Sequence, residues 1–222
     1  MIKGLVFDMD GLLFDSERVV QKSWSAAGEE LGYSDIGGQI YHTIGFNRKR
    51  RAEFFRKVYG ESFPWDRFQE KAAKHFTEIV AGQGLPMKQG VREILKFAEE
   101  RDLRVGLATS SSSEYALDNL RSGGIYDYFD GFVFGNMVTL SKPAPEIYEK
   151  ACAAIGVEPS EAVALEDSPA GIASAYAAGL RPVMIPDLVE PDEETLSKVW
   201  LCRGSLLEVI PALEAELSAP SL

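Results

Sequence analysis

The chain has 222 residues, which suits one large domain or a core domain with a smaller inserted one. An apolar content of 45% and a charged content of 26% are typical of a globular protein that buries a sizeable core. The net charge of -11 argues against a protein that binds nucleic acid or anionic membranes, and the two cysteines, Cys152 and Cys202, fit neither a zinc site nor a disulfide framework.

The first part of the chain begins with an apolar run and continues as helices. Residues 2–7 predict a buried strand, and this run is too short for a signal sequence or a membrane span. A glycine-rich loop contains Gly37 and Gly38. Helices are predicted on either side of this loop, over residues 16–32, 48–59 and 64–81.

From residue 86 onward, strand-like apolar runs alternate with helical patterns. Strands are predicted over residues 103–108, 131–134, 162–165 and 182–185, with a further short one over 200–202. Helices are predicted over residues 91–101, 112–122, 145–155, 169–178 and 206–217. Because short strands alternate with helices, the sequence predicts an α/β fold whose parallel sheet is covered on both faces.

The helical stretch near the N-terminus interrupts this alternation, because it falls between the first strand and the first helix of the α/β part. We therefore expect a core domain formed by residues 1–15 and 83–222, with an all-helical cap domain inserted as residues 16–82. The alternative is that these helices pack directly on the sheet as additional elements of one domain.

Polar residues follow several of the predicted strands. In an open parallel sheet, ligands bind outside the carboxyl ends of the strands, so these residues are candidates for one site. In chain order, the strands are followed by Asp8 and Asp10, by Thr109 and Ser110, by Lys142, and by Glu166 and Asp167.

The types of these side chains indicate phosphate chemistry with a metal ion. Clustered carboxylates repel one another, so a buried group of them requires a cation. Oxygen ligands without a cluster of Cys and His favour a hard ion, and Mg²⁺ beside an anionic substrate fits best. Thr109 and the backbone N–H groups at the start of the following helix can bind a phosphate, and Lys142 offsets the charge of the nucleophile and the phosphate.

Asp8 is the better candidate for a nucleophile, because it ends the strand directly. Attack of its carboxylate on phosphorus gives an acyl phosphate, which divides one difficult step into two. Asp10 would protonate the leaving oxygen and would then activate water for the second step.

Each of these signals also has an ordinary structural explanation. Two aspartates after a strand often form a turn, and a run of hydroxyl residues often caps a helix. A lysine before a proline is usually at the surface, and acidic residues commonly start a helix. The order of the signals and their expected position at one edge of the sheet favour a single site.

Four segments, in this order, resemble the four motifs of the haloacid dehalogenase-like hydrolases. They are residues 8–16 (DMDGLLFDS), 107–111 (LATSS), 141–148 (SKPAPEIY) and 165–171 (LEDSPAG). The resemblance covers essentially the whole chain, and within the family it is nearest to the sugar-phosphate phosphatases and β-phosphoglucomutases with a helical cap. It implies a Rossmann-like core, a mobile cap and a Mg²⁺-dependent phosphatase that acts on a small phosphorylated metabolite, with a sugar phosphate as the expected substrate class.

The resemblance also implies a role for each matched residue. Asp8 would be the nucleophile and a metal ligand, and Asp10 would be the general acid and base, with its backbone carbonyl on the metal. Thr109 and the Ser110 amide would hold the phosphoryl group, while Lys142 would neutralise charge. On the fourth motif, Asp167 would bind Mg²⁺, and Glu166 would bind it directly or through water.

In the cap, residues 45–48 (GFNR) resemble a loop that places an arginine, here Arg48, on the distal part of the substrate. The ordinary alternative is a surface arginine in a basic run. The mutases of the family carry a histidine on the first cap helix, where this chain has Val20, and its two histidines, His42 and His75, lie elsewhere. This departure favours a phosphatase over a β-phosphoglucomutase-type mutase.

Two further alternatives are a dehalogenase, which has no use for the metal carboxylates, and a binding protein without catalysis, which has no need of Asp10. The resulting expectation is a cytoplasmic monomer that acts on a small phosphorylated metabolite and has no nucleic-acid or membrane partner.

Overall fold

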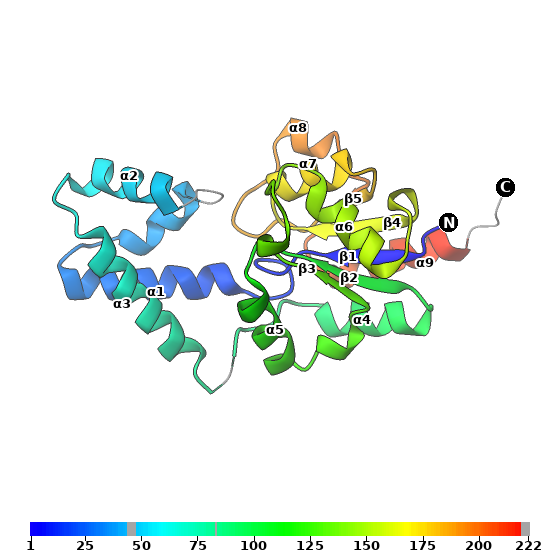
Figure 1. Ribbon diagram of the computed structural model, residues 1–222, viewed down its shortest axis with the longest axis horizontal. Helices are drawn as coiled ribbons and strands as arrows, with labels where there is room; N and C mark the ends of the chain where they lie inside the picture. The colour runs from blue at the N-terminus through cyan, green and yellow to red at the C-terminus, as the bar shows by residue number, and fades with distance from the viewer. Residues whose placement is uncertain (44–47, 83, 219–222) are drawn as a thin grey trace. The chain divides into compact units, whose positions relative to one another are not determined.

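The computed structural model describes residues 1–43, 48–82 and 84–218 (Figure 1). The chain divides into two compact units: unit 1 consists of Met1–Asp15 and Pro86–Leu222, and unit 2 of Ser16–Leu85. The first boundary coincides with the one expected for the inserted segment, and the second lies three residues later. No helix within these described ranges has both the length and the apolar character needed to cross a bilayer.

Unit 1 is built on one parallel sheet with the strand order β3-β2-β1-β4-β5-β6. Phe7 at the end of β1 lies beside Leu107 of β2 and Leu165 of β4, so the residues that follow these strands emerge at the same edge. The predicted α/β class with a parallel-sheet core is confirmed. The strands are β1 (Gly4–Phe7), β2 (Arg104–Ala108), β3 (Gly131–Val133), β4 (Ala162–Glu166), β5 (Arg181–Met184) and β6 (Leu201–Cys202).

Several helices of unit 1 begin at capping residues that the sequence supplies. Ser168 accepts a hydrogen bond from the Gly171 amide at 3.1 Å, and Pro169 occupies the first helical position of α7. Ser112 caps α5 in the same way, accepting from the Tyr115 amide at 3.4 Å. The helices are α4 (Val91–Glu100), α5 (Ser113–Ser122), α6 (Glu146–Ile155), α7 (Pro169–Ala177), α8 (Glu193–Leu196) and α9 (Ile210–Ser218).

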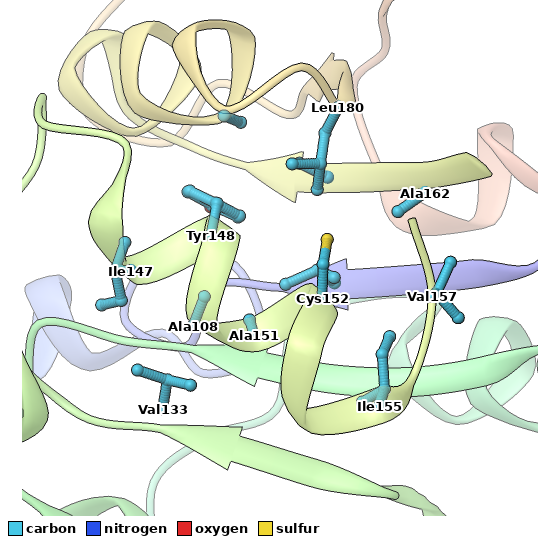
Figure 2. Packing of buried hydrophobic residues seen from close by; sticks show 13 residues of the cluster. Ala108, Val133, Ile147, Tyr148, Ala151, Cys152, Ile155, Val157, Ala162 and Leu180 are labelled. Atoms are coloured by element: carbon cyan, nitrogen blue, oxygen red, sulfur yellow. The ribbon is translucent and has the colours of Figure 1, made fainter. Parts of the chain in front are cut away.

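One face of the sheet is covered mainly by α6, which packs on β1, β2 and β3, with α7 beside it on β4 and β5 (Figure 1). Figure 2 shows the apolar side chains of this layer between helix and strands. Burial of this surface fixes α6, and with it the segment that leads from Lys142 into the helix, relative to the ends of the strands. The cluster consists of Val6, Ala108, Val133, Ile147, Tyr148, Ala151, Cys152, Ile155, Val157, Ala162, Ala164, Ala175 and Leu180.

Some predicted elements differ in detail from the observed ones. The helix predicted over residues 206–217 is divided into a 3₁₀ turn, η5 (Leu206–Glu208), and α9, because Pro211 has no N–H to continue a helix from the preceding turn. The short helix α8 was not predicted, and Asp192 caps it by accepting from the Thr195 amide at 2.8 Å. Short 3₁₀ turns also occur at η2 (Tyr126–Tyr128), η3 (Gly135–Met137) and η4 (Pro159–Glu161).

Unit 2 is helical and has a core of its own. Its elements are α1 (Ser16–Leu31), η1 (Ile36–His42), α2 (Arg48–Tyr59) and α3 (Trp65–Val80), so the loop predicted around Gly37 forms a 3₁₀ helix instead. The ring of Phe55 is fully buried, and its centroid lies 5.3 Å from those of Trp24, Trp65 and Phe68. Aromatic packing of this kind supplies the hydrophobic core of a small helical unit.

Candidate active site

Asp8 comes directly after β1 and is held at the edge of the sheet. Its amide donates to the Leu165 carbonyl of β4 at 3.0 Å, and the residue as a whole is 7% exposed. Burial raises the pKa of Asp8 to about 7, the charge of Lys142 opposes this rise, and the charge of Glu166 adds to it. The carboxylate therefore needs positive charge nearby to remain ionised at neutral pH.

Lys142 supplies that charge through three hydrogen bonds. Its Nζ donates to Asp8 Oδ1 at 2.5 Å, to Glu166 Oε1 at 2.5 Å and to the Ala108 carbonyl at 2.9 Å. The side chain is only 7% exposed, so Lys142 is not a surface lysine. Burial alone would lower the pKa of Lys142, but the charges of Asp8 and Glu166 outweigh that effect and raise it above its ordinary value.

Glu166 is the last residue of β4, and it is fully buried. Its Oε1 accepts from Lys142 and from the Tyr148 hydroxyl at 2.8 Å. Its Oε2 accepts from the Asp167 and Ser168 amides at 3.1 and 3.2 Å and from the Ser168 hydroxyl at 3.0 Å. A charged group in this position is tolerated because both oxygens are fully hydrogen-bonded.

Asp167 completes a group of three carboxylates that fits a metal ion. One oxygen from each of Asp8, Glu166 and Asp167 lies within 4.8 Å of the others. Burial raises the pKa of Asp167, and the charges of Glu166 and Asp8 raise it further. Among the described residues, no Lys or Arg forms an ion pair with Asp167, so a bound cation is the natural partner for it. An all-oxygen set suits a hard ion such as Mg²⁺.

Gly11 makes room for this carboxylate. A Cβ atom at Gly11 would lie 2.1 Å from Asp167 Oδ2, and the residue has a φ of 84°, a conformation that side-chain-bearing residues rarely adopt. The loop after β1 can therefore lie directly against Asp167 only because residue 11 is glycine.

Asp10 lies on the same loop, and two hydroxyl groups hold its carboxylate. Ser111 Oγ donates to Asp10 Oδ2 at 2.6 Å, and the Tyr115 hydroxyl donates to Oδ1 at 3.4 Å. Ser111 follows β2 and Tyr115 lies in the first turn of α5. These bonds connect the end of β1 with the end of β2.

Thr109 and Ser110 lie at the end of β2. Thr109 is buried, its amide donates to the Val133 carbonyl at 3.1 Å, and its Oγ1 accepts from the Ser111 amide at 3.1 Å. Ser110 is exposed, and its backbone lies so close to Gly135 that a Cβ there would approach the Ser110 carbonyl oxygen to 2.1 Å. The serine and threonine residues after β2 thus have two functions. Ser112 caps α5, and Thr109 and Ser110 lie at the end of the strand.

The structure brings the predicted site residues of unit 1 together, and one predicted residue, Arg48, belongs to unit 2. Asp8, Lys142, Glu166 and Asp167 form one connected group, and Asp10 joins the end of β2 through Ser111. Arg48 is the first residue of α2 in unit 2, and its side chain, like residues 44–47 before it, lies outside the described part of the structure.

Sequence reasoning assigned no role to Tyr148, Ser111 or Tyr115, although all three contact predicted site residues. Tyr148 ends the SKPAPEIY segment, and its fully buried ring lies 5.0 Å from Lys142 Nζ. The tyrosine at the end of the segment that contains the lysine was the available signal, but its meaning depends on which face of α6 meets the sheet.

Comparison with known proteins identifies the family. Residues 5–185 match the family model described as haloacid dehalogenase-like hydrolase. The phosphorylated carbohydrates phosphatase of Thermotoga maritima is 29% identical over 82% of this chain and 84% of its own length. Hexitol phosphatase B of Escherichia coli K12 is 30% identical over 83% and 84%.

A solved structure has the same fold. The crystal structure of CbbY from Rhodobacter sphaeroides in complex with phosphate has a TM-score of 0.75 and 26% sequence identity, and the match covers 94% of this chain and 96% of CbbY. The family match spans β1 to the end of β5, including every motif that carries the carboxylates and the lysine. The chain belongs to the haloacid dehalogenase-like hydrolases.

Proposed function

We propose that this protein is a Mg²⁺-dependent phosphatase that hydrolyses a small phosphorylated metabolite, of the sugar-phosphate class, through an aspartyl phosphate on Asp8. The observation that carries the proposal is the connected group at the edge of the sheet. Lys142 binds both Asp8 and Glu166, and Asp167 completes three carboxylates with oxygens within 4.8 Å of one another.

The general class rests on the family. As a haloacid dehalogenase-like hydrolase with the two named phosphatases above among its relatives, the chain is a phosphoric monoester hydrolase. The finer proposal of a sugar phosphate is supported by two of these names, which specify phosphorylated carbohydrates and hexitols as the substrates of those relatives.

Asp8 and Asp167 would hold the Mg²⁺ ion, with Glu166 binding it directly or through water, together with the Asp10 carbonyl that the family resemblance adds. When bound, the ion would supply positive charge to the phosphoryl oxygens and to the carboxylates that surround them. The protein's own cation, Lys142, binds Oδ1 of Asp8, and no donor among the described residues binds Oδ2. We infer that Oδ2 is the oxygen that attacks phosphorus.

In the first step, Asp8 Oδ2 forms a bond to phosphorus while the bond from phosphorus to the leaving oxygen breaks. Asp10 transfers a proton to that oxygen, so the alcohol leaves in neutral form. Ser111 and Tyr115 fix the Asp10 carboxyl group for this transfer. Thr109 and the Ser110 amide would bind the phosphoryl oxygens.

In the second step, Asp10 takes a proton from water, whose oxygen attacks the phosphoryl group on Asp8. The bond between phosphorus and Asp8 breaks, which releases phosphate and restores the free carboxylate. One carboxylate cannot be nucleophile and proton carrier at the same time, and this is the reason for two aspartates on the loop.

We further propose that unit 2 is the cap of this enzyme and that Arg48 contributes to the choice of substrate. Arg48→Ala is then expected to raise KM for a sugar phosphate about tenfold, and to leave hydrolysis of p-nitrophenyl phosphate nearly unchanged. Equal effects on both substrates would contradict a role in substrate choice.

The test of the main proposal is hydrolysis of p-nitrophenyl phosphate and of a panel of sugar phosphates, with Mg²⁺ or with EDTA. We expect turnover with Mg²⁺ only, and a loss of at least about 10³-fold in Asp8→Asn and in Asp10→Asn. Lys3→Met, which changes an exposed lysine, is the control. Absence of turnover on every ester in a folded, metal-loaded protein would contradict the proposal, and interconversion of hexose phosphates with a bisphosphate primer would indicate a mutase.

A further inference from the structure

A second buried ion pair lies near the carboxylate group, and the mechanism above does not use it. Lys88 Nζ donates to Asp187 Oδ1 at 2.6 Å. The Asp187 side chain is 1% exposed and that of Lys88 is 20% exposed. Because a buried ion pair is costly to desolvate and weak as a source of stability, its position is the better clue to its role.

Asp187 lies at the same edge of the sheet as the proposed metal ligands. It follows β5 by three residues, and Met184 at the end of β5 is in register with Glu166. The Ile185 amide donates to the Glu166 carbonyl at 2.7 Å, which keeps the chain leaving β5 beside the end of β4.

Asp187 brings a further carboxylate to the edge of the sheet that carries Glu166 and Asp167. Burial is the main reason why the pKa of Asp167 is raised, the charges of Glu166 and Asp8 raise it further, and Lys142 opposes them. The charge of Asp187 also raises the pKa of Asp167. Asp187 therefore adds to the negative charge of the other carboxylates at this end of the sheet.

The segment that contains Lys88 is hydrogen-bonded to the loop that carries Asp10. The Lys88 amide donates to the Leu13 carbonyl at 2.9 Å, and the Asp15 amide donates to the Pro86 carbonyl at 2.8 Å. Phe14 of this loop pairs with Met87 on one side and with Asp10 on the other.

The same loop reaches back to the metal carboxylates. The Gly11 amide donates to the Phe14 carbonyl at 2.9 Å, and Gly11 lies against the Asp167 carboxylate. The Lys88–Asp187 ion pair thus joins the segment that contains Lys88 to the chain that leaves β5.

We propose that Lys88 and Asp187 are a positioning pair of the cation site: Asp187 adds negative charge beside Asp167, and Lys88 limits that charge while holding the loop segment in place. The inference rests on the proposed Mg²⁺ dependence and extends it to two residues outside the four motifs. Neither side chain is required to touch the ion or the substrate.

The two members of the pair should affect cation binding in opposite directions. Lys88→Met removes a positive charge and keeps the length of the side chain, so Mg²⁺ should bind more tightly. Asp187→Asn removes a negative charge and keeps the shape, so Mg²⁺ should bind more weakly. Each change is expected to be about three- to tenfold, the size that one nearby charge produces on a divalent ion at an effective dielectric between those of protein and water.

The experiment is calorimetric titration of Mg²⁺ into the full-length, metal-free protein at pH 8 without substrate, with the change in Tm on adding Mg²⁺ as a second measure. The double variant K88M/D187N should return to within about twofold of the original Kd, because the two charge changes cancel. Lys88→Arg, which keeps the charge, should bind as the original protein does.

A matched control pair is available at the opposite end of the sheet. Lys3, just before β1, is paired with Glu161 at 2.8 Å, and Lys3→Met and Glu161→Gln are expected to leave the Kd unchanged. Weaker Mg²⁺ binding in both single variants of the Lys88–Asp187 pair, or no change in either, would overturn the proposal. A merely structural role would not change the Kd in opposite directions in the two variants.

The outcomes also separate this inference from the proposed function. If Lys88→Met does not fold, weaker binding in Asp187→Asn with an unchanged Lys88→Arg supports the proposal, and an unchanged Asp187→Asn overturns it. A protein that binds Mg²⁺ and hydrolyses phosphate esters, but whose pair variants bind Mg²⁺ normally, would refute this inference alone. A protein that binds no Mg²⁺ at all would refute both.

Discussion

The two units of this chain contain similar numbers of Lys and Arg, but they differ in the number of acidic residues and in the burial of charged side chains. Unit 1 contains 12 Lys and Arg against 25 Asp and Glu, whereas unit 2 contains 11 against 9. Among the described residues, the two charged residues that are buried as a whole, Asp8 and Glu166, are both in unit 1. The buried polar residues of unit 2 are Ser16, Ser23 and Thr43.

The difference follows from the backbone of each unit. In unit 1 a parallel sheet ends at one edge, so short segments after several strands bring charged side chains together at fixed positions. In unit 2 the helices meet through aromatic rings, and the Arg51 guanidinium of α2 lies over the Trp24 ring, 5.3 Å from its centroid. Reactive groups are therefore concentrated where strand ends fix them, and unit 2 contributes a separate hydrophobic core.

Loss of Lys142 should have the largest effect, because it leaves two buried carboxylates without their cation. Lys142→Met is expected to lower the free energy of unfolding by about 3–5 kcal/mol at neutral pH, measured with urea, and to reduce turnover about 10²–10³-fold. Lys150→Met, which removes a surface lysine 46% exposed, should change stability by less than about 1 kcal/mol. Similarly small effects of the two variants would contradict the role assigned to Lys142 between the buried carboxylates.

Loss of Phe55 should break unit 2 without touching the chemistry of unit 1. Phe55→Ala removes the fully buried ring at the centre of the aromatic core and should cost about 3–5 kcal/mol. We expect a separate early unfolding transition in calorimetry, while the calorimetric Kd for Mg²⁺ stays unchanged. Tyr41→Ala, at a ring that is 48% exposed, is the control. Loss of Mg²⁺ binding in Phe55→Ala would contradict the independence of the two cores.

Gly171→Ala should damage the site through a single methyl group. A Cβ there would lie 1.9 Å from the Glu166 carboxyl carbon, and Glu166 is fully buried, so the carboxylate has to move. Turnover should fall at least about tenfold, as expected for a displaced charged group near the reacting atoms. Gly38→Ala in unit 2, where no atom lies within 4 Å of the added carbon, should leave activity unchanged.

Glu146 should give the smallest effect, and one that depends on pH. The hydrogen bond from Lys150, with those from the Leu140 and Thr139 amides, lowers the pKa of Glu146 from 4.5 to about 2. A carboxyl group whose pKa is lowered by folding adds stability to the folded state. This contribution is complete above the pKa of the group in the unfolded chain, and it is lost as pH falls through its pKa in the folded protein. Glu146→Gln should therefore lower Tm at pH 7, with a difference that vanishes near pH 2. An equal difference at both pH values would contradict this account.

Much of unit 1 could be predicted from sequence, because each strand is a short apolar run with a polar residue at its end. Asp8, Lys142, Glu166 and Asp167 were predicted at one edge on this ground, and they lie together in the structure. Tyr148 and Ser111 could not be assigned in this way, because their contacts depend on how α6 and the segment after β2 approach the strands.

Other features required information that no local pattern contains. Lys88 and Asp187 are 99 residues apart and meet only after the sheet has formed. The break between η5 and α9 was readable in principle, since Pro211 marks it. The 3₁₀ helix η1 was missed because glycines at positions 37 and 38 favour a loop in isolation, and packing against α1 decides otherwise.

The central claim is that Asp8 carries the phosphoryl group between the two chemical steps. The most direct measurement is to quench the Mg²⁺-loaded enzyme with acid during turnover of a sugar phosphate, reduce it with borohydride, and map the peptides by mass spectrometry. An acyl phosphate on Asp8 predicts homoserine at position 8, absent from Asp8→Asn and from enzyme without substrate. Steady turnover with an unmodified residue 8, or turnover that survives in Asp8→Asn, would contradict the account.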